Sequence, residues 1–432
     1  MEAIKATTYD NYNDSGVEWL GEIPEHWQIK PGFTILFESK EKNTGFKENT
    51  VLSLSYGNVI IKPEEKLTGL VPESFETYQL VEPGDIIIRP TDLQNDKTSL
   101  RTGLAKDKGI ITSAYINLRI LKGYSNKYFH YYLHTIDINK VIYGLGSGLR
   151  QNISFEDFKR FPFPFPPLPE QTAIAQFLDD KTTKIDQAIA IKQQQIALLK
   201  ERKQILIHKA VTCGLNDKVK LKDSGVEWIG EIPEHWEVKR LKNICSINKN
   251  ALPETTNKDY KLTYVDIGSV TLEEGIVETE NFFFKDAPSR ARRIAKSGDT
   301  VISTVRTYLK AIDFVGVEKS NFIYSTGFAV LEPKKFMHPQ FIASFVRSDA
   351  FTEQVTVNSK GMSYPAINST DLSRLFVVHP EKSEQQEIAE YIETASTKIE
   401  TAIGLKEQEI EKLQEYKSSL INSVVTGKVR VC

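Results

Sequence analysis

The sequence predicts an α+β protein in which two mixed α/β bodies are separated by two long helices that form an antiparallel coiled coil. Three observations predict this fold: an internal repeat, a heptad pattern at the end of each repeat, and short apolar runs between them. The chain has 432 residues, of which 40% are hydrophobic and 26% are charged, as in an ordinary globular protein. At roughly 100–200 residues per domain, this length predicts about two to four structural units.

The internal repeat is visible in two leader segments. Residues 14–27 read DSGVEWLGEIPEHW and residues 223–236 read DSGVEWIGEIPEHW, so that the two segments differ at a single position. A second match aligns residues 170–212 with residues 384–426 at an offset of 214, without a gap and with 19 of 43 positions identical. The chain is therefore a tandem duplication, and each copy consists of a leader, a body of about 140 residues and a tail.

The tails carry apolar residues at alternating steps of four and three, which is the seam of a coiled coil. At 1.5 Å per residue, a helix of 43 residues is about 65 Å long. One helix cannot bury so narrow a stripe by itself, so we predict that the two tails pair antiparallel and give the repeat a pseudo-two-fold axis. Two separate surface helices are the alternative. The apolar seam positions are Leu178, Ile185, Ile189, Ile196, Leu199, Leu206, Ile392, Ile399, Ile403, Ile410, Leu413 and Leu420.

The bodies contain short apolar runs bounded by turn residues, which are typical of strands. Residues 83–88 parallel residues 297–302, since both read Gly-Asp followed by an apolar strand, and residues 144–161 parallel residues 358–375. Between these anchors the two bodies differ widely. The predicted strands are 51–54, 85–88, 110–111, 116–120, 300–303 and 328–331, and the predicted body helices are 127–133 and 339–346.

The charge balance permits nucleic-acid binding without demonstrating it. A net charge of −2 argues against a stand-alone nucleic-acid binder, for which a basic domain is expected. The two bodies are nevertheless mildly positive: residues 28–169 contain 18 Lys and Arg against 15 Asp and Glu, and residues 238–380 contain 19 against 15. Residues 381–432 are acidic, with 7 basic residues against 10 acidic ones.

Cysteine usage and hydropathy indicate a cytoplasmic chain. No apolar run approaches the roughly 18 residues of a membrane span, and the first residues lack the basic start and apolar core of a signal peptide. Cys213, Cys245 and Cys432 are too few and too far apart for a disulfide framework or a zinc site. We therefore expect a reducing compartment and no membrane partner.

Catalytic motifs are absent or weak in the sequence. The Gly-Lys pair at Gly427 lacks the other residues of a phosphate-binding loop, and the glycine-rich residues 144–148 precede no clear helix start. His130 and His134 have the i, i+4 spacing of zinc ligands but lack the intervening glutamate, so a packed aromatic helix is the favoured interpretation. A loose Asp…Glu-x-Lys nuclease pattern at Glu237 is not repeated in the first copy. The sequence thus offers no metal site and no catalytic residue.

Here the plan of the chain resembles the specificity subunit of type I restriction-modification systems over nearly its whole length. Residues 165–171, FPPLPEQ, are similar to that family's entry into its first spacer helix, and residues 226–233, VEWIGEIP, are similar to the start of its recognition domains. The second copy departs from this pattern at residues 380–385, PEKSEQ, which keep only the Glu-Gln pair. We interpret that departure as drift that leaves the helix intact.

The resemblance implies a DNA-recognition subunit that is not itself an enzyme. Each body is then expected to be a target recognition domain for one half of a bipartite, asymmetric target in double-stranded DNA. The helices are expected to dock two modification (methyltransferase) subunits, and restriction subunits are expected to join the complex. The implied domains are residues 1–168 (first recognition domain with leader), 169–222 (central spacer helix), 223–380 (second recognition domain) and 381–432 (C-terminal spacer helix).

The resemblance implies no cofactor in this chain, because S-adenosylmethionine, ATP and Mg²⁺ are expected on the partner subunits. One alternative is a duplicated coiled-coil scaffold that binds proteins or glycans and no DNA. Another is a self-sufficient nuclease or methyltransferase, which the missing motifs oppose. DNA capture in the presence of the methyltransferase partner separates the first alternative from the favoured function.

Candidate DNA-binding residues lie on loops next to the predicted strands. Hydrogen-bonding side chains read base edges, whereas Lys and Arg on phosphates position the protein. A plain solvated role is the alternative for each residue, and the arginines around residue 291 are also a candidate partner-docking patch. In the first body the candidates are Arg89, Thr91, Gln94, Asn95, Lys97, Arg101, Ser147, Arg150, Gln151 and Asn152. In the second body they are Arg290, Arg292, Arg293, Ser303, Thr304, Arg306, Tyr308, Lys310, Lys360, Ser363 and Tyr364.

Overall fold

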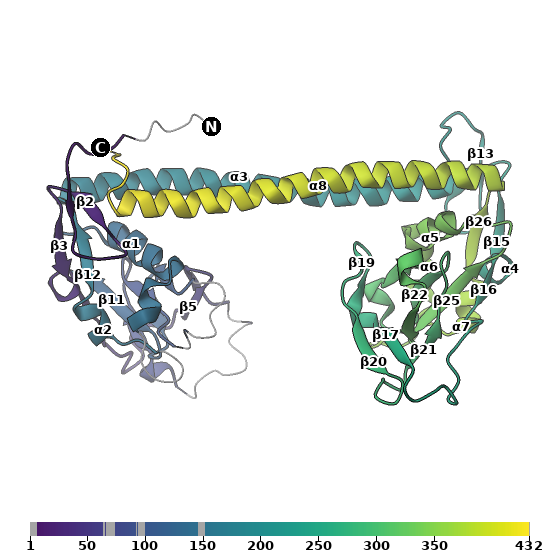
Figure 1. Ribbon diagram of the computed structural model, residues 1–432, viewed down its shortest axis with the longest axis horizontal. Coiled ribbons are helices and arrows are strands. Elements are labelled where there is room, and N and C mark those ends of the chain that lie inside the picture. The colour runs from purple at the N-terminus through teal and green to yellow at the C-terminus, as the bar shows by residue number, and fades with distance from the viewer. Residues whose placement is uncertain are drawn as a thin grey trace. The chain divides into compact units, whose positions relative to one another are not determined.

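The computed structural model divides into two compact units, which are described separately. Unit 1 comprises residues 1–192 and 407–432, and unit 2 comprises residues 193–406. Each unit contains one body and part of both tails (Figure 1). The structure describes residues 7–63, 65, 74–91, 93, 100–145 and 152–431.

The two tails are long helices, α3 (Leu168–Cys213) and α8 (Lys382–Val425). Each helix ends before a glycine in the left-handed region, since Gly214 has a φ of 76° and Gly427 has a φ of 74°, which is the usual way for a helix to stop. An added Cβ at Gly427 would lie 2.4 Å from Pro24, so this glycine also lets the leader of unit 1 approach the end of α8.

The helices run antiparallel, as predicted. Ion pairs join them within each unit, and the residue number rises along one helix as it falls along the other. All twelve predicted seam residues are buried or half-buried. The ion pairs are Lys192–Glu409 and Asp186–Lys417 in unit 1 and Lys203–Glu400 in unit 2.

Unit 1 adds two short helices and twelve strands to its share of α3 and α8, counted over the residues that the structure describes. They are β1 (Tyr12–Asp14), β2 (Glu22–Pro24), β3 (Gln28–Pro31), β4 (Leu36–Glu38), β5 (Leu52–Ser55), β6 (Asn58–Ile61), β7 (Gln79–Val81), β8 (Ile86–Ile88), β9 (Thr102–Leu104), β10 (Gly109–Ile111), β11 (Ile116–Ile120), α1 (Asn126–Ile138), α2 (Phe155–Lys159) and β12 (Pro162–Phe165).

A four-stranded antiparallel sheet in the order β4-β11-β8-β9 forms the centre of unit 1. Strand β8 alternates between two cores, as expected for side chains that point to opposite faces. Ile86 and Ile88 pack with α1 and with the ends of α3 and α8, whereas Ile87 packs with outer strands. The helix ends, through residues such as Leu178 and Val424, are thus part of the core of unit 1.

Unit 2 repeats this plan with a more complete outer sheet. Its elements are β13 (Leu221–Asp223), β14 (Glu231–Pro233), β15 (Glu237–Arg240), α4 (Leu241–Ile244), β16 (Cys245–Ile247), β17 (Lys261–Val265), β18 (Val270–Thr271), β19 (Gly275–Ile276), β20 (Glu280–Phe283), β21 (Ala291–Ile294), β22 (Thr300–Ser303), β23 (Ile312–Phe314), β24 (Phe322–Ser325), β25 (Phe328–Pro333), α5 (Pro339–Arg347), α6 (Asp349–Asn358), α7 (Ser369–Arg374) and β26 (Phe376–His379).

The central sheet of unit 2 has the order β16-β25-β22-β23, which matches the central sheet of unit 1 strand for strand. The outer sheet has the order β20-β17-β24-β21, and its strands β17 and β24 are parallel. Unit 1 shows the same pairing as a single parallel bridge between Val51 and Ile110. The duplication is therefore present in the tertiary structure as well as in the sequence, and the predicted fold class is confirmed.

Candidate nucleic-acid interface

Two loops of unit 2 lie side by side at the end of strand β22. The carbonyl oxygen of Thr304 accepts a hydrogen bond from the backbone N–H of Ile367 at 2.9 Å. The hydroxyls of Thr307 and Ser359 lie 2.8 Å apart. The structure thus brings together two segments that the sequence analysis had proposed separately. We call residues 304–310 and 359–366 the loop pair of unit 2.

Unit 1 holds the equivalent loops in the same way. Its Pro90 carbonyl oxygen accepts from the Ile153 backbone N–H at 3.0 Å, and both residues lie 214 positions before their partners in unit 2. The neck of the first loop is also shared, because Arg89 N donates to Arg101 O in unit 1 as Ser303 N donates to Ala311 O in unit 2. We call residues 90–100 and 145–152 the loop pair of unit 1.

Several candidates in unit 1 lie outside the described residues, namely Gln94, Asn95, Lys97, Ser147, Arg150 and Gln151. Of the others, Arg89, Thr91 and Asn152 are exposed. Arg101 is buried instead, and its guanidinium donates to the carbonyl oxygens of Thr91 at 2.5 Å and Arg89 at 3.4 Å. Arg101 therefore holds the backbone of Arg89 and Thr91 at the start of the loop, which corrects the prediction that it contacts DNA.

Some candidates in and next to the loop pair of unit 2 are buried or bonded within the protein, and the others are exposed. Ser303 is buried, and the Thr304 hydroxyl donates to the carbonyl oxygen of Gly327 at 2.9 Å. Lys310 is held by two carboxylates of α6, Asp349 at 3.5 Å and Glu353 at 3.3 Å. These three candidates are therefore better explained as parts of the frame than as DNA contacts. The exposed candidates are Arg306, Tyr308, Lys360, Ser363 and Tyr364.

The three arginines of residues 290–293, at the start of strand β21, lie in different environments. Arg290 is exposed and lies next to the loop pair, because its carbonyl oxygen accepts from Thr326 N, one residue from the Gly327 that bonds Thr304. Arg292 stacks its guanidinium over Phe284, 4.7 Å from the ring centre. Arg293 is half-buried, and burial lowers its pKa. Only Arg290 of the three thus combines full exposure with a place beside the loops.

Arg293 instead lines a polar groove of about 650 Å³. Other basic and hydroxyl side chains of this groove are Lys242, Lys334, Ser369 and Thr370. The groove has three basic and no acidic lining residues, and none of its lining residues belongs to the loop pair. The cluster therefore does not act as one patch.

The sequence analysis missed the apolar residues of the loop pair. Met362 is completely exposed, and Val305 and Leu309 are more than one third exposed. The signal that could have found them is their position beside named candidates, because Val305 adjoins Arg306, Leu309 adjoins Lys310 and Met362 adjoins Ser363. In the structure Arg306 and Lys310 adopt left-handed backbone angles, with φ values of 53° and 47°. Such angles are uncommon for residues other than glycine and often mark functional loops.

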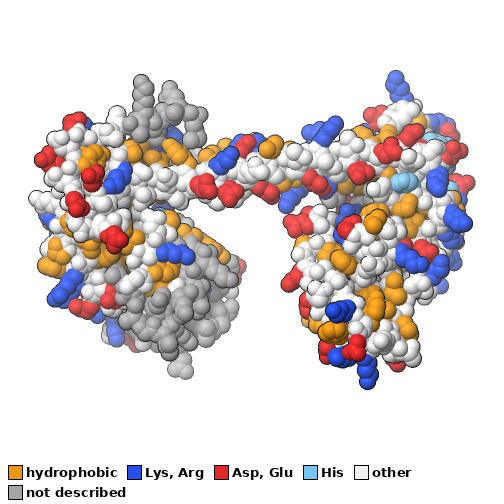
Figure 2. Space-filling view, in the orientation of Figure 1, with side chains coloured by type: hydrophobic (Ala, Val, Ile, Leu, Met, Phe, Trp, Pro, Cys, Tyr) orange, Lys and Arg blue, Asp and Glu red, His pale blue; other side chains and the backbone are white. Residues whose placement is uncertain are grey.

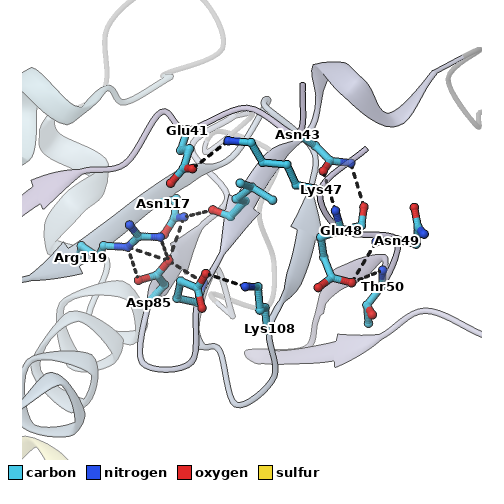
Figure 3. Close-up of polar contacts among 12 residues, drawn as sticks. Glu41, Asn43, Lys47, Glu48, Asn49, Thr50, Asp85, Lys108, Asn117 and Arg119 are labelled. Carbon is cyan, nitrogen blue, oxygen red and sulfur yellow. Dashed lines mark hydrogen bonds and ion pairs between the residues drawn. The ribbon is translucent and has the colours of Figure 1, made fainter. Parts of the chain in front are cut away.

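The repeated Gly-Asp motif proves to be structural in both units. In unit 1, Asp85 accepts from the backbone N–H of Glu82 at 3.0 Å and from Asn117 at 3.1 Å, and it forms an ion pair with Arg119 at 2.9 Å (Figure 3). Asp85 is buried. The motif therefore closes the turn into β8, and Arg119 on the neighbouring strand β11 balances its charge.

In unit 2 the equivalent acid has a different neighbour. Asp299 accepts from the backbone N–H of Lys296 at 2.8 Å, just as Asp85 accepts from Glu82. Strand registry places Leu331 opposite Thr300 as it places Leu118 opposite Ile86, so Glu332 occupies the position of Arg119. Burial, with a smaller contribution from Glu332, raises the pKa of Asp299 to about 6.

The glutamate at the start of each long helix anchors the leader. Glu170 accepts from the Trp27 indole N–H at 3.0 Å and lies 2.8 Å from His26. In unit 2, Glu384 accepts from Trp236 at 2.9 Å in the same way. Trp27 and Trp236 are buried, so these tryptophans anchor the leader to the helix and are not free to stack on a partner.

The glutamine that follows each glutamate anchors the body. Gln385 is buried, accepts from the backbone N–H of His338 at 2.7 Å and donates to the carbonyl oxygen of Pro380 at 2.8 Å. Gln171 makes the corresponding bonds in unit 1 to Ser125 and Pro166. These contacts explain why PEKSEQ keeps the Glu-Gln pair, although it lacks the prolines at the positions of Pro167 and Pro169.

Replacing Gln385 with alanine is expected to destabilise the chain by about 1–3 kcal/mol, since two buried backbone groups lose their partners. Urea unfolding of the full chain measures the effect. The matched control is Gln386→Ala, because the neighbouring Gln386 is exposed and bonds only Glu390 on the helix surface. Equal stability of the two variants would contradict this role of Gln385.

The structure supports the aromatic interpretation of His130 and His134. Both lie on α1, where Tyr128, Phe129 and Tyr132 are fully buried. Burial lowers the pKa of His130 to about 3 and that of His134 to about 4. Among the described residues there is no cluster of three His, Cys, Asp or Glu side chains that could hold a metal ion, and no described helix is long and apolar enough to cross a membrane.

Comparison with protein families shows a match in both copies. The model of the type I restriction modification DNA specificity domain matches residues 36–201 and 233–414. The chain is 24% identical over 429 residues to the putative type I restriction enzyme MjaX specificity subunit of Methanocaldococcus jannaschii, over 95% of this chain and 96% of that protein. It is 27% identical over 298 residues to the MjaVIII specificity subunit of the same organism, over 66% of each chain.

Solved structures share the fold at low sequence identity. A chain from a structure described as the "structural basis underlying complex assembly and conformational transition of the type I R-M system" aligns with a TM-score of 0.68 and 13% identity, over 93% of this chain and 98% of that one. The HsdS subunit from Thermoanaerobacter tengcongensis aligns with a TM-score of 0.52 and 14% identity, over 94% of this chain and 98% of that one.

Proposed function

The chain belongs to the family of type I restriction-modification DNA specificity subunits, and from this premise we propose that it reads a bipartite DNA target with one body for each half. It is a DNA sequence-recognition subunit. The chemistry of modification then belongs to partner subunits, and this chain contributes recognition and assembly without a catalytic site of its own.

The observation that carries the proposal is that the two bodies hold their loop pairs by the same backbone bonds, whereas the loops themselves differ. The bonds from Ile153 to Pro90 and from Ile367 to Thr304 hold the loop pairs in the same way. The first loop nevertheless has eleven residues in unit 1, residues 90–100, and seven in unit 2, residues 304–310. Two bodies that hold different loops by the same backbone bonds can each bind a different DNA sequence, which suits an asymmetric target.

The charge of the loops differs between the units. The loop pair of unit 1 contains two acidic and two basic residues, whereas the loop pair of unit 2 contains three basic residues and no acidic one. Figure 2 shows acidic and basic side chains interspersed over the visible face of each body. A large share of protein–DNA affinity comes from phosphate contacts, so we expect weak DNA binding by this chain alone and tighter binding when partner subunits close around the duplex.

We propose that two modification subunits dock on the long helices. Exposed apolar side chains on the part of α3 in unit 2 support this proposal, because Leu198 and Ile205 lie seven residues apart and are exposed. Restriction subunits are expected to join the same complex. S-adenosylmethionine, ATP and Mg²⁺ are expected to bind those partners.

Methylation-site mapping tests the proposed function. The chain is expressed with its neighbouring methyltransferase in an unmodified host, and the genome is sequenced for methyladenine. We expect a bipartite asymmetric motif, of which one half changes when residues 28–169 are exchanged for those of a relative and the other half changes when residues 238–380 are exchanged. A stable complex without new methylation would favour a duplicated scaffold that does not read DNA.

Arg290 is expected to contact a phosphate, because it is exposed beside the loop pair of unit 2. Arg290→Ala should weaken binding of the complex to all DNA sequences alike and reduce the slope of log K against log salt by about 1. Fluorescence anisotropy with target and scrambled duplexes at several salt concentrations measures both effects. A loss confined to one base pair of the target would instead assign Arg290 to base reading.

A further inference from the structure

Resting on the proposed function, we infer that the second body reads its half-site through an apolar tip that packs against the bases themselves. The tip consists of Tyr308 on the first loop and of Met362 and Tyr364 on the second. Their side chains are 57%, 102% and 63% exposed. The specificity-determining residues of this body are therefore apolar and aromatic, and the sequence analysis had emphasised hydrogen-bonding ones.

Four polar side chains of the loop pair are already engaged within the protein. Thr304 bonds Gly327, Thr307 bonds Ser359, and Lys310 lies between two carboxylates of α6. The groups left facing solvent are mainly apolar, with Arg306, Lys360 and Ser363 beside them. Direct hydrogen bonds to base edges are thus supplied by few residues here.

The backbone that carries the tip residues is held in one conformation. Arg306 and Lys310 keep left-handed backbone angles at the two ends of the turn Thr307–Leu309, and Thr307 in that turn is buried. The Arg306 guanidinium lies 5.2 Å from the centre of the Tyr364 ring and so joins the two loops at their exposed side. Ordered presentation of apolar groups reduces the entropy lost on binding.

The positive side chains around the tip favour DNA over a protein surface as its partner. Arg306 and Lys360 belong to the loop pair, Arg290 lies next to it, and all three are exposed. The loop pair has no acidic residue. Phosphates on either side of a contacted base step would therefore meet positive side chains, while apolar groups between them can contact thymine methyl groups or enter the base stack.

Unit 1 does not repeat this chemistry. The residues 214 positions before Met362 and Tyr364 are Gly148 and Arg150, and its first loop contains Gln94 and Asn95. Amide and guanidinium groups read base edges by hydrogen bonds. The two bodies are thus expected to read their half-sites by different means, with apolar contact confined to the half assigned to unit 2.

The test uses the complex of the full chain with its methyltransferase and duplexes that contain the mapped target. Met362→Ala is expected to weaken binding to the target by about tenfold, to leave binding to scrambled DNA unchanged, and to lose discrimination only in the half-site of unit 2. Val317→Ala is the control, because Val317 is an equally apolar, 79% exposed residue of unit 2 outside the loop pair. Tyr364→Ala should behave like Met362→Ala.

Two modified duplexes identify the contact. If the loss caused by Met362→Ala disappears when uracil replaces thymine in that half-site, the tip contacts methyl groups. If 2-aminopurine placed there brightens on binding of the wild-type complex and does not brighten with Met362→Ala, the tip enters the base stack. Unchanged affinity and discrimination in both Met362→Ala and Tyr364→Ala would overturn the inference while leaving the proposed function standing. A wild-type complex that does not prefer the mapped target would refute the proposed function itself.

Discussion

Replacing Arg119 with methionine is expected to destabilise the protein by about 3 kcal/mol, because it leaves the buried Asp85 carboxylate without its charge partner. Asp85 is 2% exposed and its oxygen lies 2.9 Å from the Arg119 guanidinium. The hydrogen bonds that Arg119 donates to Asp85 also raise the pKa of Arg119, so the pair stabilises the charged form of the arginine. Urea unfolding of the full chain at neutral pH measures the loss.

Lys108→Met is the matched control for Arg119→Met. Lys108 pairs with Glu82 at 3.4 Å (Figure 3), but both members of this pair are well exposed. Surface pairs of this kind contribute about 0–1 kcal/mol. Adding Asp85→Asn to Arg119→Met should recover part of the lost stability, since it removes the unpaired charge. Similar losses in Arg119→Met and Lys108→Met would show that the buried pair has no special role.

Asp299→Asn is expected to change the stability in the opposite direction from Arg119→Met, and to stabilise the protein at neutral pH by about 1–2 kcal/mol. Asp299 is buried and faces Glu332 where Asp85 faces Arg119. An asparagine oxygen can still accept the hydrogen bond from Lys296 N, and the substitution removes the cost of burying a negative charge.

The pH dependence of this effect follows from the raised pKa of Asp299. Its folded-state pKa is about 6 and its ordinary value is 3.8, so between these values the folded protein holds a proton that the unfolded chain has lost. Wild-type stability therefore falls as pH rises from about 4 to 6, and the gain in Asp299→Asn grows over the same window. Lys249 and Lys296 also face Asp299 and oppose the shift.

Urea unfolding of the wild type and of Asp299→Asn between pH 4.5 and pH 7.5 measures the difference, which isolates Asp299 from other titrating groups. Asp85→Asn is the comparison variant and should destabilise at neutral pH, because it breaks the pair with Arg119. A pH-independent difference between the wild type and Asp299→Asn would contradict the assignment.

The sequence predicted the central elements because their patterns are local. The four-three pattern of the tails depends only on residues within one helix, and the central strands β11 and β22 are short segments rich in apolar and β-branched residues, found at the predicted bounds. The predicted strands 51–54 and 110–111 correspond to the outer strands β5 and β10 of unit 1, but the outer strands of unit 2 were missed. Strand β20 leaves most of its side chains exposed although it contains Phe282 and Phe283, and strand β21 contains two arginines, so neither was recognised as a strand.

The candidate interface was only partly predictable. Residue type selected the segments around Arg306 and Tyr364, but it could not show that these segments adjoin, since they come together through bonds between residues far apart in the chain. Residue type was misleading for Arg101, which is buried, and for Met362, which is exposed. Burial depends on long-range packing and is not a property of the residue alone.

By itself, the sequence determined the duplication, the paired helical tails and the resemblance to the specificity-subunit family, because identical segments and a heptad pattern can be recognised in the sequence alone. Only the tertiary structure decided what each repeated residue does. Asp85 and Asp299 stand in the same Gly-Asp motif, yet one is paired with Arg119 and the other faces Glu332. That difference is set by registry with a strand more than 30 residues further along the chain. Backbone hydrogen bonds between residues more than 60 positions apart bring the two halves of each loop pair together.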